Sequence, residues 1–262
     1  MPEIKPEIRP EIVTLAALSD NYDFLVHDPA SGRTALVDAA DPAPVLDALS
    51  ERGWTLDEIW LTHHHWDHVD GTPGLVEATG AAVTGAKADQ HRLPPLTRVV
   101  EPGQSFVFAG HEVQVLAADG HTLGHIAYHI PSAKALFSAD SLMALGCGRL
   151  FEGTPAQMWE TLSRFAALPE DTVVYSGHEY TASNARFALT IEPENTALIN
   201  RAKAIDAARA NGEATVPSPL SLELATNPFL RAGLTTVKQV LGMEDATDAE
   251  VFAEIRARKD SF

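Results

Sequence analysis

The sequence predicts an α/β body followed by a smaller α-helical domain, and three observations indicate this. Strand-like alternation and helix-like periodicity of apolar residues take turns along residues 12–177. Beyond Tyr180 the pattern is almost wholly helical, so we expect the second domain over residues 178–262. The composition, with 45% hydrophobic and 21% charged residues among 262, is typical of a globular chain with a large core.

The first elements follow from local patterns. Residues 12–15, 22–27 and 34–37 predict strands separated by turn residues, which makes an antiparallel meander. Residues 42–52 predict a helix with an apolar face. A strand that ends at Leu61, a loop and a helix that stops before Gly80 then form a βαβ-type unit.

Later elements complete the body. Two hairpins are predicted, one over residues 104–116 and one over residues 126–138. A helix over residues 155–168 and a strand over residues 172–176 follow. Residues 2–12 contain three Pro-Glu-Ile repeats, and we expect an extended N-terminal arm over residues 1–11.

Charge and cysteine content exclude several classes of function. The net charge of −17 opposes binding to nucleic acid or to an anionic membrane, so we expect neither partner. No apolar run approaches the roughly 18 residues that span a bilayer, and the N-terminus lacks the apolar core of a secretory signal. Cys147 is the single cysteine, which fits a reducing compartment, and we expect a cytoplasmic protein. We interpret Cys147 as a buried thiol, because no base can be assigned to activate it as a nucleophile.

The stretch Thr62-His63-His64-His65-Trp66-Asp67-His68 carries most of the chemistry. Four potential metal ligands fall within six positions after an apolar run: His63, His65, Asp67 and His68. Imidazoles and carboxylates at a strand end lose solvation without gaining a partner, so fold stability alone does not explain this cluster. Alternation along an extended segment predicts His63, His65 and Asp67 on one side and His64 on the other.

Three further candidate ligands lie where predicted strands meet loops, namely His121, Asp140 and His178. Strand ends on one edge of a sheet converge on a cleft, so these side chains are expected to join the first cluster. Imidazoles and carboxylates without thiolate suit Zn²⁺, Fe²⁺ or Mn²⁺ and leave coordination positions for water. The sequence therefore favours a catalytic site with two metal ions over a structural metal site.

These motifs resemble a known family. The segment from Thr62 to His68 resembles the THxHxDH signature of the metallo-β-lactamase superfamily. Residues 120–125, 146–154 and 177–181 resemble glyoxalase II, the hydroxyacylglutathione hydrolases, and the likeness extends through residues 227–231 to the C-terminus. The resemblance implies a four-layer αβ/βα sandwich with a C-terminal α-helical substrate-binding domain.

The resemblance also implies roles for the ligands. His63, His65 and His121 would hold one metal ion, Asp67, His68 and His178 a second, and Asp140 would bridge the two. Zinc is the expected metal, with iron or manganese as alternatives. The implied reaction is hydrolysis of S-(2-hydroxyacyl)glutathione, typically S-D-lactoylglutathione to D-lactate and glutathione. A hydroxide that bridges the metal ions and is oriented by Asp67 would be the nucleophile.

The implied substrate carries carboxylates, so an acidic protein needs local basic contacts. Arg256 and Lys259 lie three positions apart on the last predicted helix and are expected to bind the glycine carboxylate of glutathione. From the residues alone, the alternative is a basic helix terminus that complements the macrodipole. By resemblance, Arg149 is a basic glutathione contact and Tyr180 a hydrogen-bonding phenol. Phe151 replaces a tyrosine of the vertebrate-like pattern, so one hydroxyl contact is lost.

Other functions stay open on the sequence alone. A glutathione persulfide dioxygenase with a single iron is the first alternative, a lactonase or nuclease the second, and a noncatalytic metal-binding module the third. The Arg256/Lys259 pair favours the hydrolase, and the acidity of the chain argues against a nuclease. Asp70 and Asp119 depart from the family pattern beside the ligand loops, with no effect assigned. We expect a monomer.

Overall fold

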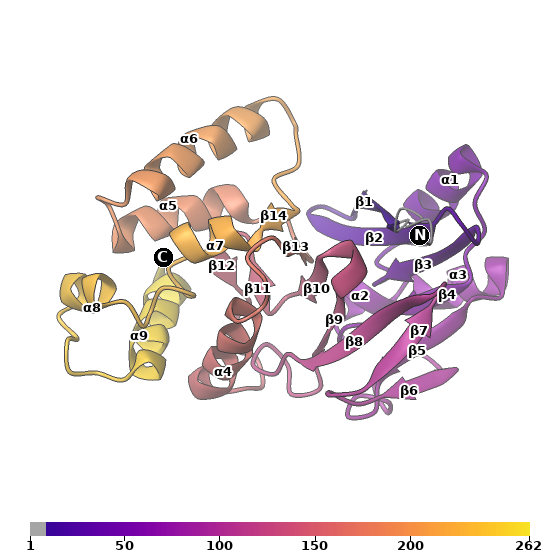
Figure 1. Cartoon of the computed structure of the whole chain (residues 1–262), viewed down its shortest axis with the longest axis horizontal. Helices are drawn as coiled ribbons and strands as arrows, with labels where there is room; N and C mark the ends of the chain where they lie inside the picture. Colours follow the sequence, from indigo (N-terminus) through magenta and orange to yellow (C-terminus); the bar gives the residue numbers. More distant parts are fainter. Residues whose placement is uncertain (1–8) are drawn as a thin grey trace, which may run out of the picture.

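Two six-stranded sheets lie face to face in the computed structural model, which describes residues 9–262 (Figure 1). The first sheet, in the order β1-β2-β3-β4-β5-β6, contains β1 (Glu11–Ala17), β2 (Asn21–Asp28), β3 (Arg33–Val37), β4 (Glu58–Trp60), β5 (Ala82–Ala86) and β6 (Arg98–Val100). The second, in the order β14-β13-β10-β9-β8-β7, contains β7 (Ser105–Phe108), β8 (His111–Ala117), β9 (Ile126–Ile130), β10 (Ala135–Ala139), β13 (Val173–Ser176) and β14 (Ser218–Pro219). A separate hairpin pairs β11 (Leu142–Met143) with β12 (Gly146–Cys147).

The helices are α1 (Pro42–Arg52), α2 (Trp66–Val69), α3 (Thr72–Thr79), α4 (Pro155–Ala166), α5 (Thr181–Ile191), α6 (Thr196–Ala210), α7 (Leu220–Thr226), α8 (Thr235–Leu241) and α9 (Asp248–Ser261), with a 3-10 turn at Pro131–Ala133. Side-chain caps open four of the helices in the described part of the chain, α1, α4, α6 and α9. Thr154 and Thr247 open α4 and α9 with complete capping boxes, which satisfy amides that the first helical turn leaves unpaired. Within residues 9–262, no helix is long and apolar enough to cross a membrane.

Alternation of side chains along the strands builds four layers. In β2, Phe24 and Val26 face the core between the sheets, whereas Leu25 belongs to the outer core under α1 and α3. On the far side, the second sheet packs against α4 and the C-terminal helices through residues such as Leu136 and Phe252. This is the expected four-layer αβ/βα sandwich, followed by a C-terminal helical region of α5 to α9 (Figure 1).

The predicted meander and both predicted hairpins are present. The sequence did not predict β6, α2, β14 or the hairpin of β11 and β12, all of which are too short to show a period. Strand β14 comes from the helical part of the chain and still pairs with β13 at the edge of the second sheet. Of the expected arm over residues 1–11, residues 1–8 lie outside the described part, and Glu11 already belongs to β1.

The carboxyl ends of strands from both sheets meet at one edge. Strands β3 and β4 run parallel, as do β10 and β13, so the residues that follow them emerge side by side. Asp38 follows β3 and Ala139 ends β10, and their φ angles are 57° and 41°. Non-glycine residues keep such left-handed angles, at a cost of about 1–3 kcal/mol each, only where the surrounding structure enforces them. Backbone strain therefore gathers at the edge that carries the candidate ligands.

Candidate active site

Three histidines form a first cluster. His63 Nε2 lies 3.1 Å from His65 Nδ1, and His121 Nε2 lies 3.0 Å from the same atom of His65. The second nitrogen of His121 donates to the Arg149 carbonyl at 2.8 Å, so its Nε2 carries a lone pair. The second nitrogen of His63 lies 3.0 Å from Thr62 Oγ1, whose own proton goes to a carboxylate, so this hydroxyl accepts from the ring. Nitrogen lone pairs thus point into the centre of this cluster.

Asp67, His68 and His178 form a second cluster. Asp67 Oδ2 lies 3.4 Å from His178 Nε2 and 3.7 Å from His68 Nε2, and the two Nε2 atoms are 3.4 Å apart. The Nδ1 atom of His68 donates to Asp38 Oδ2 at 3.0 Å, and that of His178 donates to Asp20 Oδ1 at 2.9 Å. Because an ionised carboxylate only accepts, each Nδ1 keeps its proton, and Nε2 is the nitrogen of each ring that can ligate once it is deprotonated.

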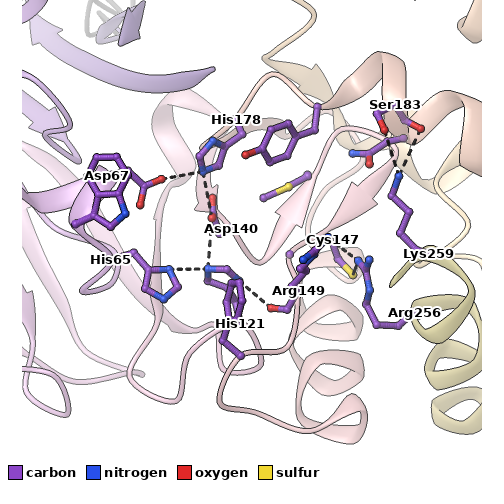
Figure 2. Close-up of a pocket in the computed structure, with 16 residues that line it drawn as sticks. His65, Asp67, His121, Asp140, Cys147, Arg149, His178, Ser183, Arg256 and Lys259 are labelled. Carbon is purple, nitrogen blue, oxygen red and sulfur yellow. Dashed lines mark hydrogen bonds and ion pairs between the residues drawn. The ribbon is translucent and has the colours of Figure 1, made fainter. Parts of the chain in front are cut away.

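Asp140 lies between the two clusters (Figure 2). Its Oδ2 is 3.3 Å from His178 Nε2 and 3.4 Å from His121 Nε2, and its Oδ1 is 3.6 Å from His68 Nε2. The carboxylate is buried, and Oδ1 has no hydrogen-bond partner within the described residues. A buried, unsatisfied carboxylate among nitrogen lone pairs is costly unless cations neutralise it. The donor set of imidazoles and carboxylates therefore fits divalent metal ions.

Protonation states follow from burial and charge. Burial holds the pKa of His63 well below its usual value and lowers the pKa of His65 to about 4, so both rings are neutral. Although burial opposes its ionisation, neighbouring histidines hold the pKa of Asp140 well below its usual range. Although burial opposes its protonation, Asp140 and Asp38 raise the pKa of His68. Burial opposes protonation of His178 as well, but Asp140 raises its pKa. A metal ion must therefore displace protons from the histidines of the second cluster, whereas the rings of the first cluster are ready to ligate.

In the loop over residues 62–68, the orientation of His64 agrees with the expectation from the sequence, whereas the backbone conformation at Asp67 does not. His64 points away from both clusters, and its Nδ1 lies 3.1 Å from Asp89 Oδ2. Strand alternation was the wrong basis for Asp67, because Trp66–Val69 form the short helix α2 and turn Asp67 into the second cluster. His125 packs beside the site and stacks on His63 with ring centroids 4.6 Å apart.

Sequence reasoning missed three residues that orient the candidate ligands. Asp38 accepts from the amide and hydroxyl of Thr62 and from His68. Asp20 accepts from His178. Asn21 Nδ2 donates to Asp67 Oδ2 at 3.0 Å. One signal was available, since Asp38 directly follows a predicted strand, at the position where parallel neighbours place functional side chains.

A cavity of about 590 Å³ opens over the two clusters. All five expected substrate contacts line this cavity, namely Arg149, Phe151, Tyr180, Arg256 and Lys259. Five of the candidate ligands line it as well, namely His65, Asp67, His121, Asp140 and His178. Figure 2 shows the histidines and aspartates at one end and the cations at the other. The structure thus brings the two expected groups of residues into one pocket.

The three cations differ in burial. Arg149 is exposed, whereas Arg256 is only 5% exposed and donates from Nη1 to the Cys147 carbonyl at 2.9 Å and from Nη2 to Asp260 at 2.8 Å. Burial, and then the charge of Arg256, lowers the pKa of Lys259 to about 8. Burial raises the pKa of Cys147 to about 11, which fits the interpretation of an inert thiol. Arg256 is therefore already engaged in the pocket wall, which leaves Arg149 and Lys259 more accessible to a ligand.

Two aromatic side chains border the mouth of the pocket. Phe151 is 63% exposed, and its ring centroid lies 5.5 Å from that of His65 and 5.3 Å from that of His121. Tyr180 stacks on His178 with 4.8 Å between centroids. Burial, followed by the charge of Asp20, raises the pKa of the Tyr180 phenol, so it keeps its proton for donation.

Comparison with known proteins extends over almost the whole chain. The family model of the metallo-beta-lactamase superfamily matches residues 22–178, and that of the hydroxyacylglutathione hydrolase C-terminus matches residues 179–262. The hydroxyacylglutathione hydrolase of Ruegeria pomeroyi is 62% identical over 96% of this chain and 99% of its own length. Among solved structures, ETHE1 from Myxococcus xanthus has a TM-score of 0.64 at 22% identity, covering 96% of this chain and 100% of that chain. TTHA1623 in a di-iron-bound form has a TM-score of 0.61 at 26% identity, covering 84% and 99%. With both family models and a full-length relative in agreement, this chain belongs to the hydroxyacylglutathione hydrolases of the metallo-β-lactamase superfamily.

Proposed function

We propose that this chain hydrolyses S-(2-hydroxyacyl)glutathione thioesters, typically S-D-lactoylglutathione to D-lactate and glutathione. One observation carries the proposal: a single pocket joins a set of convergent imidazoles and carboxylates to a wall of cations. The first group suits hydrolysis, and the second suits the carboxylates of glutathione. Membership in the hydroxyacylglutathione hydrolases supports the same substrate.

Two divalent metal ions are part of the proposal. The first ion would be held by His63, His65 and His121, and the second by Asp67, His68 and His178. Asp140 would contribute to both sites. Zinc is the first candidate, because imidazole and carboxylate suit it, and the same ligands accept iron or manganese. The di-iron form of the related TTHA1623 keeps iron among the candidates. When bound, such ions lower the pKa of water toward neutrality and polarise a carbonyl group.

The protein's own groups then have defined tasks. Asp67 Oδ2 is held by Asn21 and lies at the edge of the second cluster, where it can orient water for attack and accept its proton. The departing glutathione thiolate needs little protonation, since a thiol has a pKa of about 8.5. The ring of Phe151 covers His65 and His121 and limits access of bulk water to the scissile bond.

Substrate recognition is assigned to the cationic and aromatic side chains of the pocket. Arg149 and Lys259 would bind the carboxylates of glutathione, and Arg256 would add positive potential from within the wall. Tyr180 would donate its phenolic proton to the peptide backbone of glutathione, while Phe151 offers only apolar contact. This division leaves the acyl group at the end of the pocket where the histidines lie.

We also propose the wider organisation of the protein. Residues 12–177 would be the catalytic domain and residues 178–262 the substrate-binding domain, which agrees with the extents of the two matching family models. The single cysteine, Cys147, supports a place in the reducing cytoplasm. A monomer is sufficient for this mechanism, since one chain supplies both sides of the pocket.

The decisive experiment measures hydrolysis of S-D-lactoylglutathione by the purified protein through loss of thioester absorbance, with metal content determined on the same sample. Turnover should disappear on chelation and return with zinc, iron or manganese. Oxygen uptake with glutathione persulfide is measured in parallel. Oxygen consumption without thioester hydrolysis would replace the proposal by a dioxygenase. A metal-loaded protein inert in both assays would refute both reactions, and lactones would be tested next.

A further inference from the structure

The hairpin of β11 and β12 connects two parts of the candidate metal centre. Asp140 precedes the hairpin, and Arg149 follows it with the carbonyl that accepts from His121 Nδ1 at 2.8 Å. Gly148 packs against both ligands, because a Cβ atom there would lie 2.0 Å from the Asp140 carbonyl oxygen and 2.8 Å from His121 Nδ1. The position of this hairpin therefore sets the positions of Asp140 and His121.

Side chains of the C-terminal region bind the backbone of the hairpin. At each of five consecutive residues, 143 to 147, one backbone group is bonded to such a side chain. Asn227 Nδ2 donates to the carbonyls of residues 143 and 146 at 3.1 and 3.0 Å, and Asn184 Nδ2 donates to that of residue 144 at 3.0 Å. Glu223 Oε2 accepts from the amide of residue 145 at 2.8 Å, and Arg256 donates to the carbonyl of residue 147 at 2.9 Å. All four of these side chains are buried.

The turn of the hairpin depends on these bonds. Leu145 has a φ of 56°, a left-handed conformation that a leucine keeps only where its surroundings enforce it. Its amide is bound by Glu223, which is itself paired with Arg201 on α6. A buried carboxylate held in this way fixes the turn more firmly than a bond within the hairpin alone.

We propose that Asn227 is a positioning residue for the metal centre. With Asn184, Glu223 and Arg256 it fixes the hairpin, so the C-terminal helices place Asp140 and orient His121 in addition to binding substrate. The inference rests on the proposed metal site and adds a task to the helical region. It also gives a role to a buried carboxamide that does not line the pocket and has no hydrogen bond to a candidate ligand.

The test compares two asparagines of the same region in the full-length protein. Asn227→Ala removes the bonds to the hairpin. Asn195→Ala is the control, because Asn195 also donates to a carbonyl, that of Ala225 at 3.0 Å, and caps α6 without reaching the hairpin. Zinc affinity is measured by competition with a chromophoric chelator, and kcat and KM with S-D-lactoylglutathione. Hydrogen exchange of the Leu145 amide is followed in the metal-free proteins.

Loss of a group that orients a metal ligand typically costs 10–100-fold in metal affinity or activity. We expect Asn227→Ala to lose about tenfold or more in zinc affinity and in kcat, with KM changed by less than about twofold and with faster exchange at Leu145. Asn195→Ala should lower the melting temperature and leave all four quantities near those of the wild type. If Asn227→Ala fails to fold, Asn227→Ser, which keeps a hydroxyl donor, takes its place.

Zinc affinity and kcat unchanged in the Asn227 variant, or lowered equally in the Asn195 control, would overturn the positioning role. Failure of the proposed function gives a different result. A wild type that binds zinc without hydrolysing the thioester refutes the proposed reaction, and zinc affinity of the variants then decides the positioning role. A wild type that binds no metal ion refutes both.

Discussion

The two ends of the pocket are built in opposite ways. At the metal end, His68, His121 and His178 each have the second ring nitrogen fixed by a carboxylate or carbonyl, so their orientation is set before any ligand arrives. At the cationic end, Arg149 is exposed and Lys259 is half-buried, so both can adjust to a ligand. The contrast separates two demands: the reacting bond needs fixed geometry, whereas affinity is spread over several adaptable contacts.

The largest effect on the fixed metal end is expected from removal of the Asp140 carboxylate, which both clusters share. Asp140→Ala should lose metal and turnover together, by more than the 10–100-fold typical for an orienting residue, because its two oxygens face both sets of ligands. Metal analysis and kcat on the same sample measure this. Asp70→Ala is the control, since this side chain is exposed beside the ligand loop. Full metal content and turnover in the Asp140 variant would contradict the bridging role.

The second-largest effect is expected where the orientation of His68 is lost. Asp38→Ala leaves His68 Nδ1 without its acceptor, and we expect metal affinity to fall by about 10–100-fold. Competition with a chelator measures the affinity. Asp41→Ala is a matched control: it removes the cap of α1, at about 1 kcal/mol of stability, a few residues along the chain. Equal metal affinity in both variants would show that Asp38 contributes only stability.

Asp38 is also an example of a role that could not be predicted from the sequence. The main strands, the longer helices of the body and the seven candidate ligands could be predicted, because each belongs to a local pattern of periodicity or spacing. The role of Asp38 depends on the parallel pairing of β3 with β4, which no local pattern gives. The same holds for the hairpin of β11 and β12, since its partner residues Asn184 and Arg256 lie 40 and 109 positions away from the groups they bind.

Two further differences between expectation and structure have physical causes, one local and one tertiary. Helix α2 has four residues, about one turn, so its periodicity is invisible in the sequence, and strand alternation was extended to Asp67 although this residue lies in a helix. The spacing of Arg256 and Lys259 correctly predicted that both face one pocket. It could not reveal that Arg256 is buried and already bonded to Cys147, because burial depends on how α9 packs against the hairpin.

A smaller effect is expected at the cationic end, where the charge of Lys259 should make KM depend on pH. The pKa of Lys259 is lowered to about 8, first by burial, so its charge is complete below that pH and is lost as the pH rises through it. A substrate carboxylate needs the charged form, and KM should therefore rise above about pH 8. Lys259→Arg keeps the charge at all these pH values and should give a flatter KM profile. Parallel profiles for the two proteins would exclude Lys259 as the titrating contact.

The smallest expected effect concerns a single hydroxyl. Phe151→Tyr should restore a hydrogen bond to glutathione worth about 0.5–1.5 kcal/mol, which lowers KM by about two- to tenfold. The value of kcat should stay unchanged, since the ring keeps its contacts with His65 and His121. Tyr180→Phe is the reciprocal variant and should raise KM by a similar factor. If Phe151→Tyr changed kcat and left KM unchanged, residue 151 would act on the reacting bond, and the division between a fixed catalytic end and an adaptable binding end would fail at this position.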